Sequence, residues 1–124
     1  MKSKSFRISL SHAWQGIKRT SRTERNFKVH IFMGLAAIFC CIVFQIETAL
    51  FVWVMFSIFT VLASELFNTA IEAIVDLASQ KKVHPLAKVA KDAAAGAVLI
   101  ASMQAVAVAF TITIIVVRRT FFTE

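Results

Sequence analysis

The stretch ALFVWVMFSIFTVLASELFNTAIEAIVD, residues 49–76, begins as an apolar run and ends with regularly spaced polar side chains. On a helix, four of these side chains fall within an arc of about 80°: Glu65, Asn68, Glu72 and Asp76. A carboxylate in or near lipid is costly unless it faces a partner, a cavity or another subunit. The stretch therefore predicts a membrane helix with a polar stripe, which is either a functional site or a seam between helices.

This helix is longer than a membrane is thick. From Ala49 to about Ser79 it would measure about 45 Å, whereas the hydrocarbon core of a bilayer is about 30 Å thick. Its last turns should therefore project from the membrane. In that placement Glu65 lies within one leaflet, Glu72 lies near the boundary and Asp76 lies beyond it.

Two further apolar segments and a basic N-terminal segment complete the predicted architecture. The segment at 98–117 carries no charge and is long enough to span the hydrocarbon. In the basic segment, Leu10, Trp14 and Ile17 follow helical spacing, which is typical of an amphipathic helix on a membrane surface. We expect one all-α membrane domain, 1–124, with a surface helix at 7–28 and helices containing the spans at 29–46, 49–79 and 86–117.

Charge distribution indicates the partner and the orientation. The net charge is +7, and of fourteen Lys and Arg residues, eight lie in 2–28, four in 81–91 and two at 118–119. Positive charge beside apolar helices is the signature of membrane orientation, and no nucleic-acid-binding module accompanies it. We expect no nucleic-acid partner. The N-terminus and the loop around Lys81 should face the cytoplasm.

The polar residues predict a site for a hard cation and a phosphate. The chain has no GxxxxGK[ST] loop, no protein-kinase signature and no HExxH helix. Carboxylates and an amide suit Mg²⁺, which usually brings substrate phosphates with it, and a lysine can neutralise phosphate charge. Residue spacing alone leaves the reaction open. The candidate residues are Glu24, Glu65, Asn68, Glu72, Asp76, Lys91 and Asp92, with His84 nearby.

Two motifs carry a resemblance to a known family. They read ExxNTAIExxVD at 65–76 and HPLAKxAKDxAAGAVL at 84–99. Together they resemble the prokaryotic diacylglycerol kinase family over about residues 10–117. The segment ERNFKVH at 24–30 is similar to the branch of undecaprenol kinases from Gram-positive bacteria.

The resemblance implies a small integral membrane kinase with three transmembrane helices and an amphipathic surface helix. Relatives of this kind are homotrimers whose active sites lie between subunits, and they use ATP and Mg²⁺. The resemblance also implies residue roles. Glu65 matches the catalytic base toward the lipid hydroxyl, Glu24 and Glu72 match metal-binding glutamates, and Asn68 matches a contact to the transferring phosphate.

Nucleotide contacts follow from the second motif. Lys91 and Asp92 match nucleotide-binding residues, His84 matches the nucleotide loop, and Asp76 matches an acidic position with a supporting role. The loop at 79–83 departs from the family pattern because it is more basic and one residue longer than in some members.

The resulting hypothesis is an ATP-dependent lipid kinase that converts undecaprenol to undecaprenyl phosphate. His30 supports this branch, because other branches carry an acidic residue there. The alternative within the family is a diacylglycerol kinase that makes phosphatidic acid. Outside the family, a small proton-coupled transporter would also place carboxylates in the membrane, but it would need polar groups near the midplane. We also expect Lys91 and Asp92 to pair with Glu72, and a non-enzymatic assembly subunit would leave this pairing unexplained.

Overall fold

The computed structural model describes residues 5–122, and all regular secondary structure within this range is helical. Three of the helices are long and apolar enough to cross a membrane. The predicted all-α class, with three membrane helices and an N-terminal helix, is therefore confirmed. The helices are α1 (Phe6–Thr23), α2 (Arg25–Val43), α3 (Thr48–Ala78) and α4 (Pro85–Phe122).

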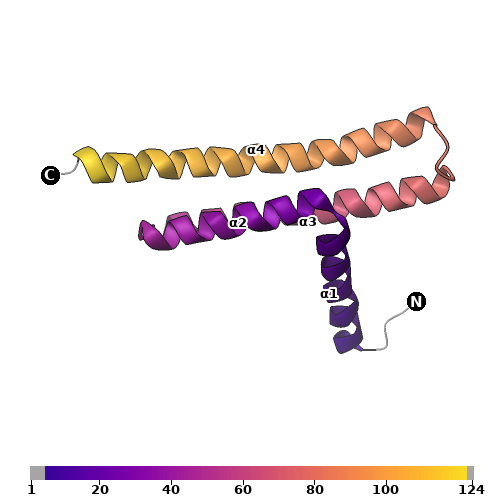
Figure 1. Cartoon of the computed structure of the whole chain (residues 1–124), viewed down its shortest axis with the longest axis horizontal. Coiled ribbons are helices and arrows are strands. Elements are labelled where there is room, and N and C mark those ends of the chain that lie inside the picture. Colours follow the sequence, from indigo (N-terminus) through magenta and orange to yellow (C-terminus); the bar gives the residue numbers. More distant parts are fainter. Residues whose placement is uncertain (1–4, 123–124) are drawn as a thin grey trace.

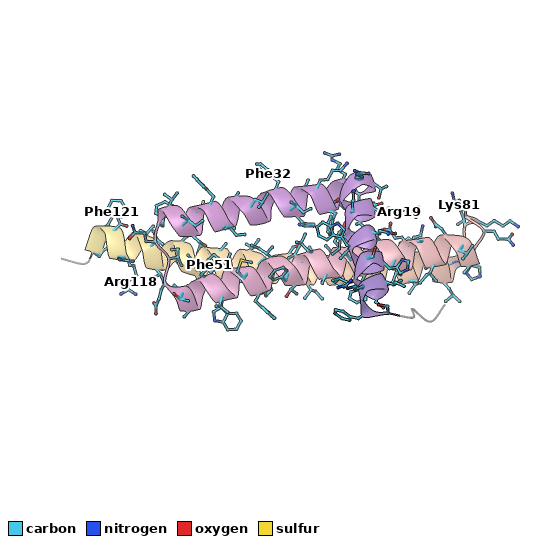
Figure 2. The ribbon with its side chains drawn as sticks, turned by 90° about the horizontal axis from the view of Figure 1, so that it is seen from below. Arg19, Phe32, Phe51, Lys81, Arg118 and Phe121 are labelled. Carbon is cyan, nitrogen blue, oxygen red and sulfur yellow. The ribbon has the colours of Figure 1, made fainter. Side chains whose placement is uncertain are left out.

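The helix α3 organises the molecule. It packs along α4 as an antiparallel hairpin and also contacts α2 and α1. In the two views, α2 and α4 lie along different sides of α3 (Figures 1 and 2). The helix α1 runs crosswise to this bundle, and α3 and α4 continue past it toward the turn that joins them (Figure 1). A surface helix and two projecting helices thus meet at one end of the molecule.

The chain turns from α1 into α2 at Glu24, earlier than predicted. We expected a surface helix at 7–28 and the next helix from 29, but Glu24 has extended backbone angles (φ −93°, ψ 120°) and belongs to neither helix. Phe27, in the first turn of α2, is only 2% exposed. Burial of this side chain fixes the start of α2 against the rest of the molecule, so the turn must precede it.

The end of α2 is closed by a Schellman motif. The N–H of Ile46 donates to the carbonyl of Cys41 at 3.0 Å, and the N–H of Gln45 donates to that of Ile42 at 3.2 Å. Gln45 takes the left-handed conformation, with φ 48°, which glycine usually supplies in this motif. This motif ends α2 at Val43, three residues before the predicted boundary.

The end of α3 is closed in the same way. The N–H of Lys81 donates to the carbonyl of Asp76 at 3.0 Å, and the N–H of Gln80 donates to the carbonyl of Leu77 at 3.3 Å. Gln80 and Lys81 both have positive φ, 53° and 59°. The reversal is short, so α4 returns directly along α3. α4 also continues to Phe122, beyond the predicted end at residue 117.

Packing within the chain is sparse. A small core joins α2, α3 and α4 around Cys41, Val54 and Ile112. A close approach of α2 and α3 occurs at Gly34, where an added Cβ would lie 3.1 Å from a methyl carbon of Ile58. Most other large apolar side chains are exposed. These exposed side chains provide the surface that lipid, or another subunit, covers in a membrane protein.

Candidate active site

The buried face of α3 carries the predicted polar residues. Glu65 is 3% exposed and Asn68 is 8% exposed. The buried side chains of α3 recur every three or four residues, so they form a single stripe along the helix. The polar stripe predicted from the sequence is therefore a continuation of the face with which α3 packs. Its members are Val54, Ser57, Val61, Glu65 and Asn68.

Glu65 is buried among charged groups from other parts of the chain. Glu24, Glu72 and His30 all lie close enough to interact with its charge. Within residues 5–122 its carboxylate receives no hydrogen bond. The fold thus gathers carboxylates from the turn before α2 and from two positions of α3 that lie about two helical turns apart. Such a cluster is unfavourable unless a cation or a proton joins it.

Asn68 offers an unused acceptor beside this cluster. Its Nδ2 donates to Oε1 of Glu72 at 3.4 Å, a long and weak hydrogen bond. Its Oδ1 is buried and has no hydrogen-bond partner among the described residues. A buried acceptor without a donor is costly. This oxygen therefore favours a site that receives a donor or a cation from a bound group.

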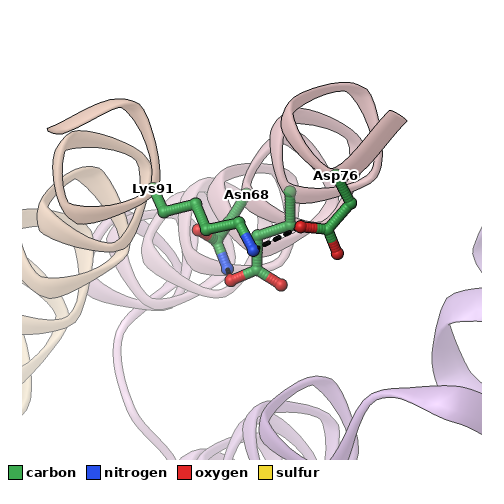
Figure 3. A network of polar contacts seen from close by, with 4 residues as sticks. Asn68, Asp76 and Lys91 are labelled. Atoms are coloured by element: carbon green, nitrogen blue, oxygen red, sulfur yellow. Dashed lines mark hydrogen bonds and ion pairs between the residues drawn. The ribbon is translucent and has the colours of Figure 1, made fainter. Parts of the chain in front are cut away.

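Lys91 reaches from α4 to the same end of α3. Its Nζ donates to Oδ1 of Asp76 at 2.5 Å, as Figure 3 shows. Lys91 precedes the uncharged run at 98–117, and this hydrogen bond raises the pKa of its ammonium group. The expected pairing with Glu72 is corrected here, because the direct partner is Asp76. Glu72 still lies close enough to interact with the charge of Lys91.

Asp92 and His84 lie outside this cluster of contacts. Asp92 is exposed and pairs with Lys88 one turn earlier in α4. His84 is also exposed, and its Nδ1 accepts the N–H of Leu86 at 3.2 Å, so it caps the start of α4. Both residues lie in the projecting part of the hairpin, where a water-soluble ligand could reach them.

The donors at this end of the bundle fit a magnesium–phosphate group. In the described part of the chain no three His, Cys, Asp or Glu residues assemble into a metal site. Mg²⁺ is usually held by only one or two carboxylates, and substrate phosphates and water supply its other ligands. Glu24 and Glu72 both lie close enough to Glu65 to interact with its charge, and Asn68 adds a buried, unpartnered Oδ1, so the residues present suit such a group.

One polar contact escaped the sequence analysis. Gln104 of α4 donates from Nε2 to Oγ of Ser57 in α3 at 2.9 Å. A signal for it exists, because Gln104 is the single amide within the uncharged run at 98–117. The position of His30 beside Glu65 was also not predicted, because it depends on how α2 packs against α3.

Comparison with known proteins adds an independent observation. A family model described as prokaryotic diacylglycerol kinase matches residues 11–113, which is most of the chain. The match includes the turn before α2, the polar stripe of α3 and the start of α4.

Two relatives match over long segments. A protein named diacylglycerol kinase from Synechocystis sp. is 41% identical over 101 residues, which is 82% of this chain and 58% of that relative. A protein named undecaprenol kinase from Bacillus subtilis is 45% identical over 97 residues, which is 77% of this chain and 76% of that relative. The matched part thus spans little more than half of the Synechocystis protein.

Proposed function

The chain belongs to the prokaryotic diacylglycerol kinase family, and on this premise we propose that it transfers the γ-phosphate of ATP to a membrane lipid alcohol. The observation that carries the proposal is the buried carboxylate of Glu65, which lies beside Glu24, Glu72 and Asn68. Glu24 lies at the turn between α1 and α2, and Figure 1 shows α1 running crosswise to the bundle from this turn. A lipid hydroxyl from the bilayer and a nucleotide from the cytosol could therefore both approach the cluster.

Glu65 acts as the general base in this proposal. Its carboxylate takes the proton of the lipid hydroxyl while that oxygen forms a bond to the γ-phosphorus. The bond from the γ-phosphorus to the bridging oxygen breaks, and ADP leaves. The surroundings of Glu65 support this role, since its carboxylate is buried and receives no hydrogen bond in the described part of the chain, so both of its oxygens are available to the hydroxyl proton.

The remaining residues position the nucleotide. Glu24 and Glu72 would hold Mg²⁺, which neutralises the charge that spreads over the phosphates. Asn68 would contact the transferring phosphate. Lys91, oriented by Asp76, adds a positive charge on the cytosolic side. Asp92 and His84 would contact the nucleotide further out, and their exposure leaves them accessible to it.

Undecaprenol is the proposed acceptor. The segment at 24–30 supports it, because it is similar to the undecaprenol kinase branch, and the relative from Bacillus subtilis carries that name. The product would be undecaprenyl phosphate. The alternative acceptor is diacylglycerol, which the name of the relative from Synechocystis favours at nearly the same identity.

Orientation and assembly complete the proposal. The N-terminus and the loop around Lys81 face the cytoplasm, because most of the positive charge lies on that side. The protein forms a homotrimer with active sites between subunits. Three features support this assembly: the sparse core, the many exposed apolar side chains and the unpartnered acceptor of Asn68.

Phosphate transfer from γ-labelled ATP tests the proposal. Purified protein in micelles receives Mg²⁺ and equal mole fractions of undecaprenol and diacylglycerol. We expect label mainly in undecaprenyl phosphate, and less of it by a factor of about 10² or more with the Glu65→Gln variant. Label mainly in phosphatidic acid would retain the mechanism and replace the acceptor. An absence of label in both lipids would overturn the kinase proposal.

A further inference from the structure

A polar bond joins α3 and α4 far from the site. Nε2 of Gln104 donates to Oγ of Ser57 at 2.9 Å, and Ser57 is only 3% exposed. The Ser57 hydroxyl itself donates to the carbonyl of Trp53 at 2.8 Å. Since a hydroxyl has one proton, Ser57 can only accept from Gln104. The Gln104 amide must therefore face it with nitrogen, and its Oε1 stays buried without a partner in the described part of the chain.

Between Lys91 and Gln104, apolar packing fixes the register of α4 on α3 only weakly. Between Lys91 and Gln104 the buried side chains of α4 are Ala94 and Ala101. Small residues let helices approach closely, but they form low ridges, and helix register depends on ridges that fit into grooves. A helix face of alanines can therefore slide along its neighbour more easily than a face of large side chains. The bond between Ser57 and Gln104 opposes such sliding.

We infer that Gln104 and Ser57 are positioning residues that set the register of α4 on α3 and thereby hold Lys91 against Asp76. Lys91 and Gln104 lie on one helix, about 20 Å apart along its axis, so a shift at one is carried to the other. Ser57 in turn belongs to the buried stripe of α3 that contains Glu65 and Asn68. This bond lies between Lys91 and the apolar core around Val54 and Ile112, and it helps to align the lysine with the site. The expected effect of this register on the KM for ATP rests on the proposed function.

Amine labelling measures this register without any catalysis. The protein in micelles is treated briefly with an amine-reactive ester, and labelling of Lys91 and Lys88 is compared by mass spectrometry. Lys88 is an internal control, because its partner Asp92 lies on the same helix. The pair of Lys88 and Asp92 therefore does not depend on the register between α3 and α4. In Ser57→Ala and in Gln104→Met we expect the ratio of Lys91 labelling to Lys88 labelling to rise about threefold. This factor corresponds to the free energy of a typical interhelical hydrogen bond in a membrane protein.

Matched variants separate register from general damage. Ser57→Thr keeps the accepting hydroxyl and should retain the wild-type ratio. Thr60→Val and Thr111→Val each remove a hydroxyl that bonds only within its own helix, and they should also leave the ratio unchanged. Circular dichroism and gel filtration establish that each variant is folded. If Ser57→Ala does not fold, Gln104→Met decides the question, because methionine preserves the length of the side chain.

Kinetics then link the register to the site. In Ser57→Ala and Gln104→Met the KM for ATP should rise about as much as the labelling ratio, while the KM for the lipid stays constant. A wild-type labelling ratio in both variants would overturn the inference. A raised ratio in a protein whose wild type transfers no phosphate would support the register and refute the proposed function, so the two failures are distinguishable.

Discussion

Glu65 is only 3% exposed, and its carboxylate receives no hydrogen bond in the described part of the chain. Burying a carboxylate in this way is expensive, and a stability criterion alone would replace it with an apolar side chain. The same surroundings leave both of its carboxylate oxygens available to accept the proton of a substrate hydroxyl. The residue is therefore better explained by chemistry than by its contribution to folding.

Glu65→Gln tests this conclusion. Because an amide cannot accept the proton, we expect turnover to fall by a factor of about 10² or more. The melting temperature should stay equal or rise, since a neutral amide is cheaper to bury than a carboxylate. The matched control is Glu47→Gln, at the exposed opposite end of α3, which should retain full turnover. Near-normal turnover in Glu65→Gln would contradict its role as base.

Glu72→Gln addresses the metal. Removing one of the two proposed carboxylate ligands should raise the Mg²⁺ concentration needed for half-maximal activity, because an amide oxygen binds the cation less strongly than a carboxylate. A magnesium titration of the initial rate measures this, again with Glu47→Gln as control. If the titration curve of Glu72→Gln overlays that of the wild type, Glu72 is not a ligand.

The sequence predicted which residues share one face of α3 better than it predicted the contacts between helices. The spacing of Glu65, Asn68 and Glu72 places them on one helix face whatever the neighbours are, because helical periodicity alone decides it. The partner of Lys91 depends instead on the register between α3 and α4. That register arises from packing, so Asp76 could not be chosen over Glu72 in advance. The capping role of His84 likewise depends on the local backbone.

At the scale of elements, the existence of the helices was predictable and their ends were not. Apolar length marks the spans, but the usual end signal is a glycine. Here glutamines occupy the left-handed positions at 45 and 80. Helix α4 also carries a stripe of alanines at every fourth residue from Ala93 to Ala109, but such a spacing drifts by about 40° per step around a helix. Only Ala101 of this stripe is buried, together with Ala94 outside it.

The two glutamines give a prediction about stability. A non-glycine residue in the left-handed conformation costs about 1–2 kcal/mol, so Gln45→Gly and Gln80→Gly should each raise the free energy of unfolding by up to about 1 kcal/mol. Denaturant unfolding in detergent measures the change. Gln15→Gly, within α1, should have the opposite sign and serves as control. A loss of stability in both turn variants would contradict the assigned helix ends.

At the scale of the whole molecule, the charged and polar groups of the site collect at one end of an apolar bundle. The helices α3 and α4 pass beyond α1 toward their turn (Figure 1). The other end of the bundle carries the turn around Gln45 and the far end of α4. This asymmetry was predictable from charge and helix length, whereas the placement of α2 and α4 along different sides of α3 required the packing.

Orientation can be measured by cysteine accessibility. In a background with Cys40→Ala and Cys41→Ala, single cysteines are placed at Thr48 and Lys82, both exposed and at opposite ends of α3. In the proposed orientation the end of α3 at residue 48 faces outward, so an impermeant maleimide applied to intact cells should label the cysteine at 48 and should label the one at 82 only after permeabilisation. The reverse pattern would invert the proposed topology.

The sparse core has a thermodynamic consequence. In residues 5–122 only seven apolar side chains are buried. Unfolding a soluble protein exposes apolar surface to water, and this raises the heat capacity by about 12–15 cal/mol/K per residue. Here the apolar side chains that lie outside the core would face lipid or detergent in both states. The heat-capacity change should therefore be far smaller, and the stability of this protein should vary almost linearly with temperature rather than pass through a maximum.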